Sequence, residues 1–308
     1  MTDLTAHSGH QVFHEYRSLL FSVAYRLLGT AADAEDAVQD AWIKWSAADR
    51  SQVADPKAYL TRIVSNLALE RLRSTRHKRE TYVGPWLPEP VLTGEDASEA
   101  VANAESVSMA MLVVLETLSP LERAVFVLKE VFAFSYAEIA EAVERSEAAV
   151  RQAAHRAREH VQARRPRFAA DRSRQREATD RFFAAATGGD VNALMELLSP
   201  DVTLWTDGGG KVRQALRPVV GAATVAGWFA AIGSVAYQGV EPADMRAELV
   251  GINGGPGIVF SGPSGVVATV TFDFGPDGLI TAIHNVANPD KLRAVTDGTT
   301  YDLGTGTR

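Results

Sequence analysis

Cysteine is absent from the 308-residue chain, which excludes a disulfide scaffold, a thiolate zinc site and a cysteine nucleophile. The chain also lacks an apolar run long enough to cross a membrane, and its first ten residues show no basic-then-apolar leader pattern. The histidines have no metal-ligand spacing with carboxylates. We therefore expect a soluble, cytoplasmic protein with no membrane contact, no metal and no cofactor.

An excess of positive charge is lacking too, since the formal net charge is -7, which at first sight argues against a nucleic-acid partner. Two blocks depart from this acidic background. Residues 57–79 hold seven Lys or Arg against one acid, and residues 145–176 hold ten Arg against three acids. Residues 177–308 hold eight basic and fourteen acidic residues, a net charge of -6. Because a polyanion responds to local charge, the two basic blocks are candidate DNA-binding segments.

The length and an apolar fraction of 46% suit two or three globular domains. Helical patterns dominate from residue 12 to about residue 161. Caps, capping boxes and proline in the first turn mark the helix starts at Thr30–Asp33, Asp55–Pro56, Ser119–Glu122 and Ser135–Glu138. The segment Gly84–Ser98 contains three prolines and two glycines and is predicted to be an extended linker.

After Arg176 the pattern changes to amphipathic helices followed by short strand-like runs. The expected helices are Ala178–Gly188, Asn192–Leu198 and Val219–Ile232. The expected strands are Val202–Trp205, Ala247–Ile252, Gly257–Ser261, Val266–Phe274 and Ile280–Val286. Helices first and an antiparallel run afterwards indicate an α+β domain with a curved sheet.

Two helices joined by a short turn, over Ser135–Val143 and Ser146–Gln162, are typical of a helix-turn-helix. A stripe of small apolar residues lets the two helices cross closely, and the opposite face of the second helix is basic. Arg grips guanine edges or phosphate, and Gln pairs with adenine. The candidate DNA contacts are the cap Ser146 and Arg151, Gln152, His155, Arg156 and Arg158. The alternative is a hairpin whose arginines are only solvated, but the one-sided charge favours DNA.

The first basic block is less specific. Its helix has basic and amide side chains on the polar side, which suit phosphates and splayed bases of a single strand. These candidates are Lys57, Arg62, Asn66, Arg71 and Arg73. Taken alone, a plain solvated helix face is the better interpretation of this block.

The helix over Ala34–Trp45 has acids on one face and apolar residues on the other. Its two tryptophans, Trp42 and Trp45, are expected to pack in the core. The remaining surface suits a basic partner helix. The candidate contacts are Glu35, Asp36, Gln39, Asp40 and Trp42.

These three features, in this order, resemble the sigma-70 superfamily, specifically its extracytoplasmic-function (ECF) group. Residues 13–45 and 54–79 are similar to sigma domain 2, and residues 118–158 are similar to sigma domain 4. The resemblance implies that the acidic helix binds the clamp helices of core RNA polymerase. It also implies that the first basic block melts and reads the -10 promoter element, and that the helix-turn-helix reads the -35 element.

The remaining 130 or so residues resemble a SnoaL-like domain of the NTF2-like superfamily, a cone-shaped α+β fold found fused to a subgroup of sigma factors. Three stretches mark that subgroup. They are Trp86, Leu87, Pro88, Glu89 and Pro90 in the linker; Asp207, Gly208, Gly209, Gly210 and Lys211; and Asn288, Pro289, Asp290, Lys291 and Leu292. The first is expected to dock on the C-terminal domain with Trp86 in an apolar cleft, unless it is a simple spacer. The other two are expected to make interdomain contacts or to be plain turns.

The expected architecture is two all-α domains followed by an α+β cone. Residues 1–82 are expected to form sigma domain 2, 83–105 the linker, 106–168 sigma domain 4 and 169–308 the SnoaL-like domain. The implied function is transcription initiation with core RNA polymerase at promoter DNA. The C-terminal domain is expected to regulate it in cis by packing on the sigma domains and the linker.

Two other functions remain open: a ligand-sensing helix-turn-helix regulator that does not bind polymerase, and a SnoaL-like enzyme with a DNA-binding appendage. Enzymes of that type use a pocket Asp or His as acid-base groups. The candidates here are Asp207, Asp273 and His284, but retained catalysis is not expected. An unidentified small-molecule ligand is left open as a partner.

Overall fold

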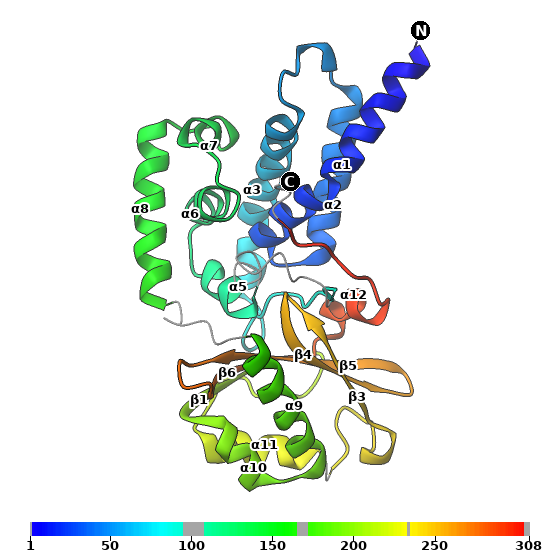
Figure 1. Ribbon diagram of the computed structural model, residues 1–308, viewed down its shortest axis with the longest axis vertical. Helices are drawn as coiled ribbons and strands as arrows, with labels where there is room; N and C mark the ends of the chain where they lie inside the picture. The colour runs from blue at the N-terminus through cyan, green and yellow to red at the C-terminus, as the bar shows by residue number, and fades with distance from the viewer. Residues whose placement is uncertain (1, 95–107, 165–171, 233–234, 305–308) are drawn as a thin grey trace.

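The computed structural model describes residues 2–94, 108–164, 172–232 and 235–304. Two groups of helices form its upper part, and a sheet with helices beneath it forms its lower part (Figure 1). The first helical group consists of α1 (Thr2–Leu28), α2 (Ala31–Ala47) and α3 (Pro56–Glu80), which pack on one another. A short 3-10 turn, η1 (Arg50–Gln52), lies between α2 and α3.

The second helical group contains the predicted helix-turn-helix. It consists of α5 (Met109–Glu116), α6 (Pro120–Phe126), the π-helical η4 (Val127–Val131), α7 (Tyr136–Ala142) and α8 (Glu147–Arg164). Both predicted capping boxes are present, at Ser119 with Glu122 and at Ser135 with Glu138. They begin α6 and α7 where the sequence predicts, and the two-helix arrangement of α7 and α8 is confirmed.

The two helical groups share one hydrophobic core, to which α1, α2, α3, α5, α6, α7 and α8 all contribute. Helix α3 lies against both α6 and α7. The guanidinium of Arg123 in α6 is buried and donates a hydrogen bond to the carbonyl of Leu27 at the end of α1, at 2.8 Å. The two groups are therefore packed as one body in this structure.

The C-terminal domain places its helices on one face of a six-stranded sheet (Figure 1). The helices are α9 (Arg172–Gly188), α10 (Val191–Leu197) and α11 (Ala222–Ile232). The strands, in the order β2-β1-β6-β5-β4-β3, are β1 (Leu198–Asp207), β2 (Val219–Val220), β3 (Arg246–Ile252), β4 (Gly255–Gly262), β5 (Gly265–Phe274) and β6 (Ile280–Val286). A 3-10 turn, η5 (Pro242–Asp244), precedes β3. The α+β class and the later strands agree with the sequence prediction.

Two predictions about this domain are wrong in detail. The sheet is mixed, because β1 pairs with β6 in parallel, with Leu204 opposite Ile283. Strands that are distant in the chain can meet in parallel once a long crossover lies between them, as β2, α11 and β3 to β5 do here. Residues 219–220, predicted to begin a helix, form β2 instead and pair with Thr203 and Leu204. Two β-branched valines favour that extended pairing.

The core between the sheet and its helices depends on aromatic rings. Phe182 of α9 is fully buried, and its ring centroid lies 4.9 Å from Phe229 and 4.8 Å from Phe272. We predict that Phe182→Ala lowers the free energy of unfolding by about 3–5 kcal/mol through lost burial and a residual cavity. Urea denaturation measures this. The exposed Val191→Ala is the control, expected within about 0.5 kcal/mol of wild type, and a similar small loss for both would contradict the prediction.

After β6 the chain turns back toward the helices. It forms η6 (Pro289–Lys291) and α12 (Arg293–Thr296), and residues 299–304 then run up to α1 (Figure 1). Tyr301 stacks on Phe21 with ring centroids 4.3 Å apart. The carbonyl of Leu303 accepts hydrogen bonds from Arg26 at 2.9 Å and from Ser22 at 3.0 Å. The end of the described chain is thus anchored to the first helix.

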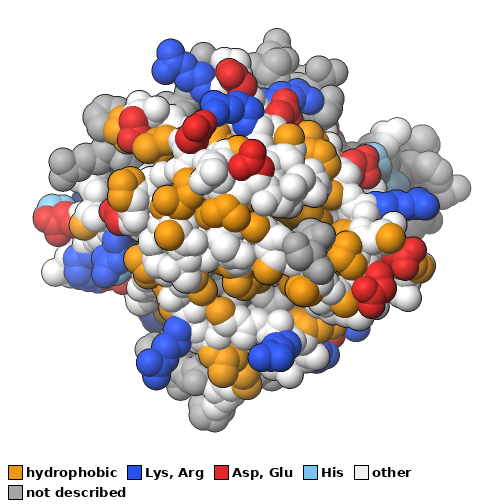
Figure 2. Space-filling view, turned by 90° about the horizontal axis from the view of Figure 1, so that it is seen from below, with side chains coloured by type: hydrophobic (Ala, Val, Ile, Leu, Met, Phe, Trp, Pro, Cys, Tyr) orange, Lys and Arg blue, Asp and Glu red, His pale blue; other side chains and the backbone are white. Residues whose placement is uncertain are grey.

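A cavity of about 340 Å³ opens between the helices and the far strands of the C-terminal domain. Its lining is apolar apart from one threonine and consists of Phe183, Ala186, Thr187, Phe229, Pro242, Met245, Ala247 and Phe260. Seen from below, apolar side chains are spread across the middle of this domain and charged ones lie mainly toward its edge (Figure 2).

In the described part of the chain, no helix combines the length and the apolar character needed to span a membrane.

Candidate functional site

The acidic surface predicted on the helix over Ala34–Trp45 lies along α2. It borders a groove of about 400 Å³ between α1 and α2. Glu35 binds Arg17 at 2.6 Å, and Asp40 binds Arg71 of α3 at 2.8 Å. Asp36 and Gln39 are exposed. The groove is lined by His10, Phe13, His14, Arg17, Glu35, Val38, Gln39 and Trp42. Two of the acids are therefore already paired with basic residues of the same group.

The two tryptophans of α2 differ in burial. Trp45 is 2% exposed, and its indole N–H donates to the carbonyl of Gly9 at 2.8 Å. The core role predicted for it is confirmed. Trp42 is half-buried, and its ring makes edge contacts with Phe13 and His10. It therefore leaves part of its surface in the groove.

All five residues predicted to contact the -10 element lie on α3. Lys57 and Asn66 are half-buried, and Arg73 is exposed. Arg62 lies over the ring of Tyr59 and binds Glu141 of α7 at 2.5 Å. This exposed ion pair joins the helix of the first basic block to the helix-turn-helix.

The residues predicted to contact the -35 element lie at the start of α8 and along it. Ser146 accepts a hydrogen bond from the backbone N–H of Ala149, as expected of a cap. Gln152 and His155 are exposed. Each arginine has a carboxylate partner: Arg151 with Glu147, Arg156 with Glu122 at 2.7 Å, and Arg158 with Glu130 at 2.7 Å. A polyanion would have to replace these exposed pairs, which are worth little individually.

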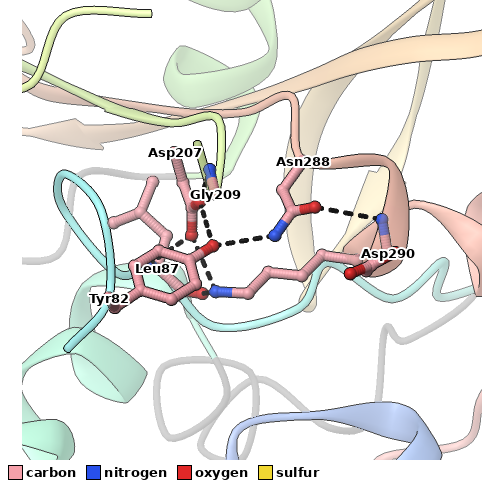
Figure 3. A network of polar contacts seen from close by, with 7 residues as sticks. Tyr82, Leu87, Asp207, Gly209, Asn288 and Asp290 are labelled. Carbon is pink, nitrogen blue, oxygen red and sulfur yellow. Dashed lines mark hydrogen bonds and ion pairs between the residues drawn. The ribbon is translucent and has the colours of Figure 1, made fainter. Parts of the chain in front are cut away.

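A network of polar contacts lies where the linker meets the C-terminal domain, a contact that we call the seam (Figure 3). The carboxylate of Asp207, at the end of β1, is its centre. One oxygen accepts from Lys291 Nζ at 2.7 Å and from the backbone N–H of Leu87 at 2.8 Å. The other accepts from the Tyr82 hydroxyl at 2.5 Å and from the backbone N–H of Gly209 at 3.1 Å. Lys291 also donates to the carbonyl of Leu87 at 2.5 Å.

The seam buries two charged side chains, and removing charges from water costs free energy. The side chains of Asp207 and Lys291 are 0% and 8% exposed. Two buried charges are tolerated when they pair and when further hydrogen bonds accompany them, as they do here. Desolvation and the neighbouring Asp207 carboxylate raise the pKa of Tyr82 above its usual value, so this hydroxyl keeps its proton and acts as the donor to Asp207.

The two C-terminal stretches singled out in the sequence meet at the seam. The amide of Asn288 donates to Tyr82 Oη at 2.8 Å, and Lys211 binds Asp290 at 2.6 Å in an exposed pair. Gly209 has φ +59°, and a Cβ there would lie 2.3 Å from Asn288. The positive φ and the close approach together require glycine. These stretches thus form contacts between segments and are more than plain turns.

The linker stretch makes contacts on both sides. Leu87, rather than Trp86, occupies the apolar cleft: it is 1% exposed and packs in one cluster with Val286 and Leu292. Trp86 is half-buried, and Lys291 Nζ lies 3.9 Å from its ring. The flat indole therefore covers a buried ammonium instead of filling a cleft. Pro88, Glu89 and Pro90 are buried as well.

The three candidate acid-base residues do not form one catalytic constellation within the described chain. Asp207 is committed to Lys291, while Asp273 and His284 form a separate buried pair 3.9 Å apart. Burial raises the pKa of Asp273 and lowers the pKa of His284, which disfavours charge on both. The lining of the apolar cavity includes none of the three. Among the described residues there is also no cluster of three or more His, Asp or Glu placed to hold a metal ion.

Four residues that connect the segments were missed in the sequence: Tyr25, Arg26, Tyr82 and Asn253. The side-chain amide of Asn253 donates to the Tyr25 hydroxyl at 2.6 Å, and its Oδ1 accepts from the backbone N–H of Val91 in the linker at 3.3 Å. The backbone N–H of Asn253 in turn donates to the carbonyl of Val91 at 3.0 Å. Asn253 with Gly254 is a hairpin-turn signal between β3 and β4 that could have been noticed. The other three lie in helical or linker patterns that carry no such signal.

The comparisons with known proteins agree with this arrangement. The Sigma-70 region 2 family matches residues 12–78, and the Sigma-70 region 4 family matches residues 108–161. The chain is 43% identical over 290 residues to "ECF RNA polymerase sigma factor SigJ" of Mycobacterium tuberculosis, covering 91% of this chain and 92% of that protein. It is 32% identical over 190 residues to "Probable ECF RNA polymerase sigma factor SigI" of the same species, covering 61% and 66%. The crystal structure of the M. tuberculosis extracytoplasmic function sigma factor SigJ superposes with a TM-score of 0.73 at 39% identity, covering 91% of this chain and 98% of that one.

Proposed function

The chain belongs to the extracytoplasmic-function group of the sigma-70 family, and on that basis we propose that its C-terminal domain regulates promoter recognition in cis. Sigma factors bind core RNA polymerase and promoter DNA. In this chain, the surface of α2 is the candidate polymerase contact. The basic residues of α3 and α8 are the candidate contacts to the -10 and -35 elements.

The observation that supports the proposal is the buried contact between the C-terminal domain and the linker. Lys291 binds both Leu87 of the linker and Asp207 of the sheet, and all three atoms involved are buried. The linker joins the two helical groups, so whatever holds it also limits their separation. Arg62 is meanwhile paired with Glu141 of the second group. Reading two separate promoter elements requires this closed arrangement to open, and contacts made by the C-terminal domain oppose opening.

Removal of residues 288–308 is expected to raise promoter-specific run-off transcription with purified core polymerase about fivefold or more. The cut leaves β1 to β6 in place and removes Asn288, Lys291 and the segment that reaches α1. A cut near Thr206 would be less informative because it falls inside β1. Helices α9 and α10 would then remain without the sheet on which they pack.

A second variant that ends at Arg164, after α8, removes the whole C-terminal domain. Its output is expected to differ from that of the full chain as well. Equal transcription by the full chain and both variants would refute regulation in cis. Failure of all three to direct transcription would refute the promoter-recognition assignment itself.

A further inference from the structure

Helix α2 begins with a cap that its own sequence does not supply. Thr30 occupies the cap position, but its hydroxyl donates to Asp33 Oδ2 at 2.6 Å and so is turned away from the helix amides. The backbone N–H of Ala31 donates instead to Glu89 Oε2 of the linker at 2.7 Å. Glu89 lies 58 residues beyond Ala31, so the cap is a tertiary contact.

Around this capping contact, the linker packs tightly against the corner between α1 and α2. Glu89 is 4% exposed, and its backbone N–H donates to the carbonyl of Gly29 at 2.8 Å. Its own carbonyl accepts from the Tyr25 hydroxyl at 2.6 Å. Gly29 has φ +72°, and a Cβ there would lie 3.0 Å from the Trp86 ring and 2.9 Å from the Glu116 carboxylate. Only glycine allows the linker this close to the corner between α1 and α2.

The charges around Glu89 act in opposite directions. The amide donors of α2 and the ammonium of Lys291 favour the ionised carboxylate, while Asp33 of α2 disfavours it. Tyr25 of α1 and Tyr301 of the returning C-terminal segment also interact electrostatically with this carboxyl. Loss of solvent is the largest effect and outweighs the favourable ones, so that burial raises the pKa of Glu89 to about 7.

We propose that Glu89 is a positioning residue for α2 and a proton-dependent latch: it holds the linker against this helix most firmly when protonated, and its ionisation favours release. The regulatory meaning of the latch rests on the proposed function, because α2 carries the candidate polymerase surface. The latch itself is a property of the free protein.

The direction of the pH effect follows from proton uptake on closing. A released Glu89 would return to its ordinary pKa of 4.5, whereas the docked carboxyl titrates near 7. The contribution of protonation to docking is therefore complete below the lower value and is lost as the pH rises through the higher one. The docked-to-released ratio should fall about tenfold between about pH 6 and about pH 8.

Hydrogen exchange at the amide of Ala31 tests the latch, because docking of Glu89 protects this proton. The full chain is compared with Glu89→Gln, which keeps an acceptor oxygen but cannot titrate, and with Glu89→Ala, which has no cap. The wild-type to Glu89→Gln ratio of protection factors is expected to fall about tenfold across that pH range, since intrinsic exchange cancels in the ratio. Glu89→Ala should lose protection at both ends of the range.

Exchange at α6, whose cap lies within its own segment, shows in the same samples whether each variant remains folded. Parallel pH profiles for wild type and Glu89→Gln would overturn the proton dependence. Wild-type protection in a folded Glu89→Ala variant would overturn the cap. Because polymerase is absent from the measurement, neither result depends on the outcome of the transcription experiment.

Discussion

Lys291→Met is expected to lower the stability of the closed protein by about 3–5 kcal/mol and to free the linker from the C-terminal domain. Methionine is close to lysine in length but leaves the Asp207 carboxylate buried without its counter-charge. Tyr82, Leu87 and Gly209 still donate to that carboxylate, yet neutral donors do not replace a cation. The contact of the ammonium with the Trp86 ring is lost as well.

Chemical denaturation measures the loss of stability. The distance between a label on the first helical group and a label on the C-terminal domain reports whether the two parts separate. Since the chain has no cysteine, cysteines introduced at the exposed Ala47 and Ala184 would be labelled uniquely. Lys211→Met is the matched control, because its pair with Asp290 is about half exposed on both sides and should be worth less than about 1 kcal/mol. Equal effects of the two lysine substitutions would show that burial of the Lys291 pair is unimportant.

Combined substitution of Arg151 and Arg156 by alanine is expected to weaken promoter binding by the polymerase complex at least tenfold. Loss of two phosphate contacts should also reduce the slope of log affinity against log salt by about two. The relevant duplex is one selected by the wild-type complex from a random pool. Both arginines are exposed, with side chains 59% and 50% accessible, so the fold should be unaffected.

Arg181→Ala supplies the control for this experiment. Arg181 is 56% exposed on α9, in the acidic C-terminal domain, and has a carboxylate 3.8 Å away. Its removal changes the net charge by one without touching α8, so the salt slope should stay at the wild-type value. An unchanged slope in the double variant would remove α8 from the DNA-binding surface.

The parts of this molecule that sequence predicts well are those determined by near neighbours. The capping boxes at Ser119 and Ser135 and the small-residue stripe of α8 act within one or two helical turns, and they appear where expected. The placement of β6 follows in the same way from a short run rich in β-branched residues, which lies between Gly278 and Pro289. The candidate DNA-binding residues could be assigned to α3 and α8 because helical periodicity is enough to place each set on a single helix.

Contacts between distant segments account for what was missed. The bonds of Asp207 and Lys291 to Leu87 cross 120 and 204 residues, and nothing local to Leu87 distinguishes it from its more conspicuous neighbour Trp86. The start of α2 shows the same limit. Thr30 has the residue type of a cap, but the actual cap is Glu89, which competes successfully because the linker is pressed against this corner. Local propensity is overridden where a tertiary partner offers a better bond.

The anchoring of Leu303 on α1 has a consequence for how the protein is made. Leu303 is synthesised 277 residues after Arg26, whose buried guanidinium uses the Leu303 carbonyl as an acceptor. Helix α1 therefore leaves the ribosome long before this acceptor exists, and during translation Arg26 must remain hydrated or use other partners. A chain that ends between Arg164 and Leu303 would keep α3 and α8, the candidate DNA-binding helices, but would lack this fastening. Translation thus completes the restraint last, so prematurely ended products are the ones expected to escape it.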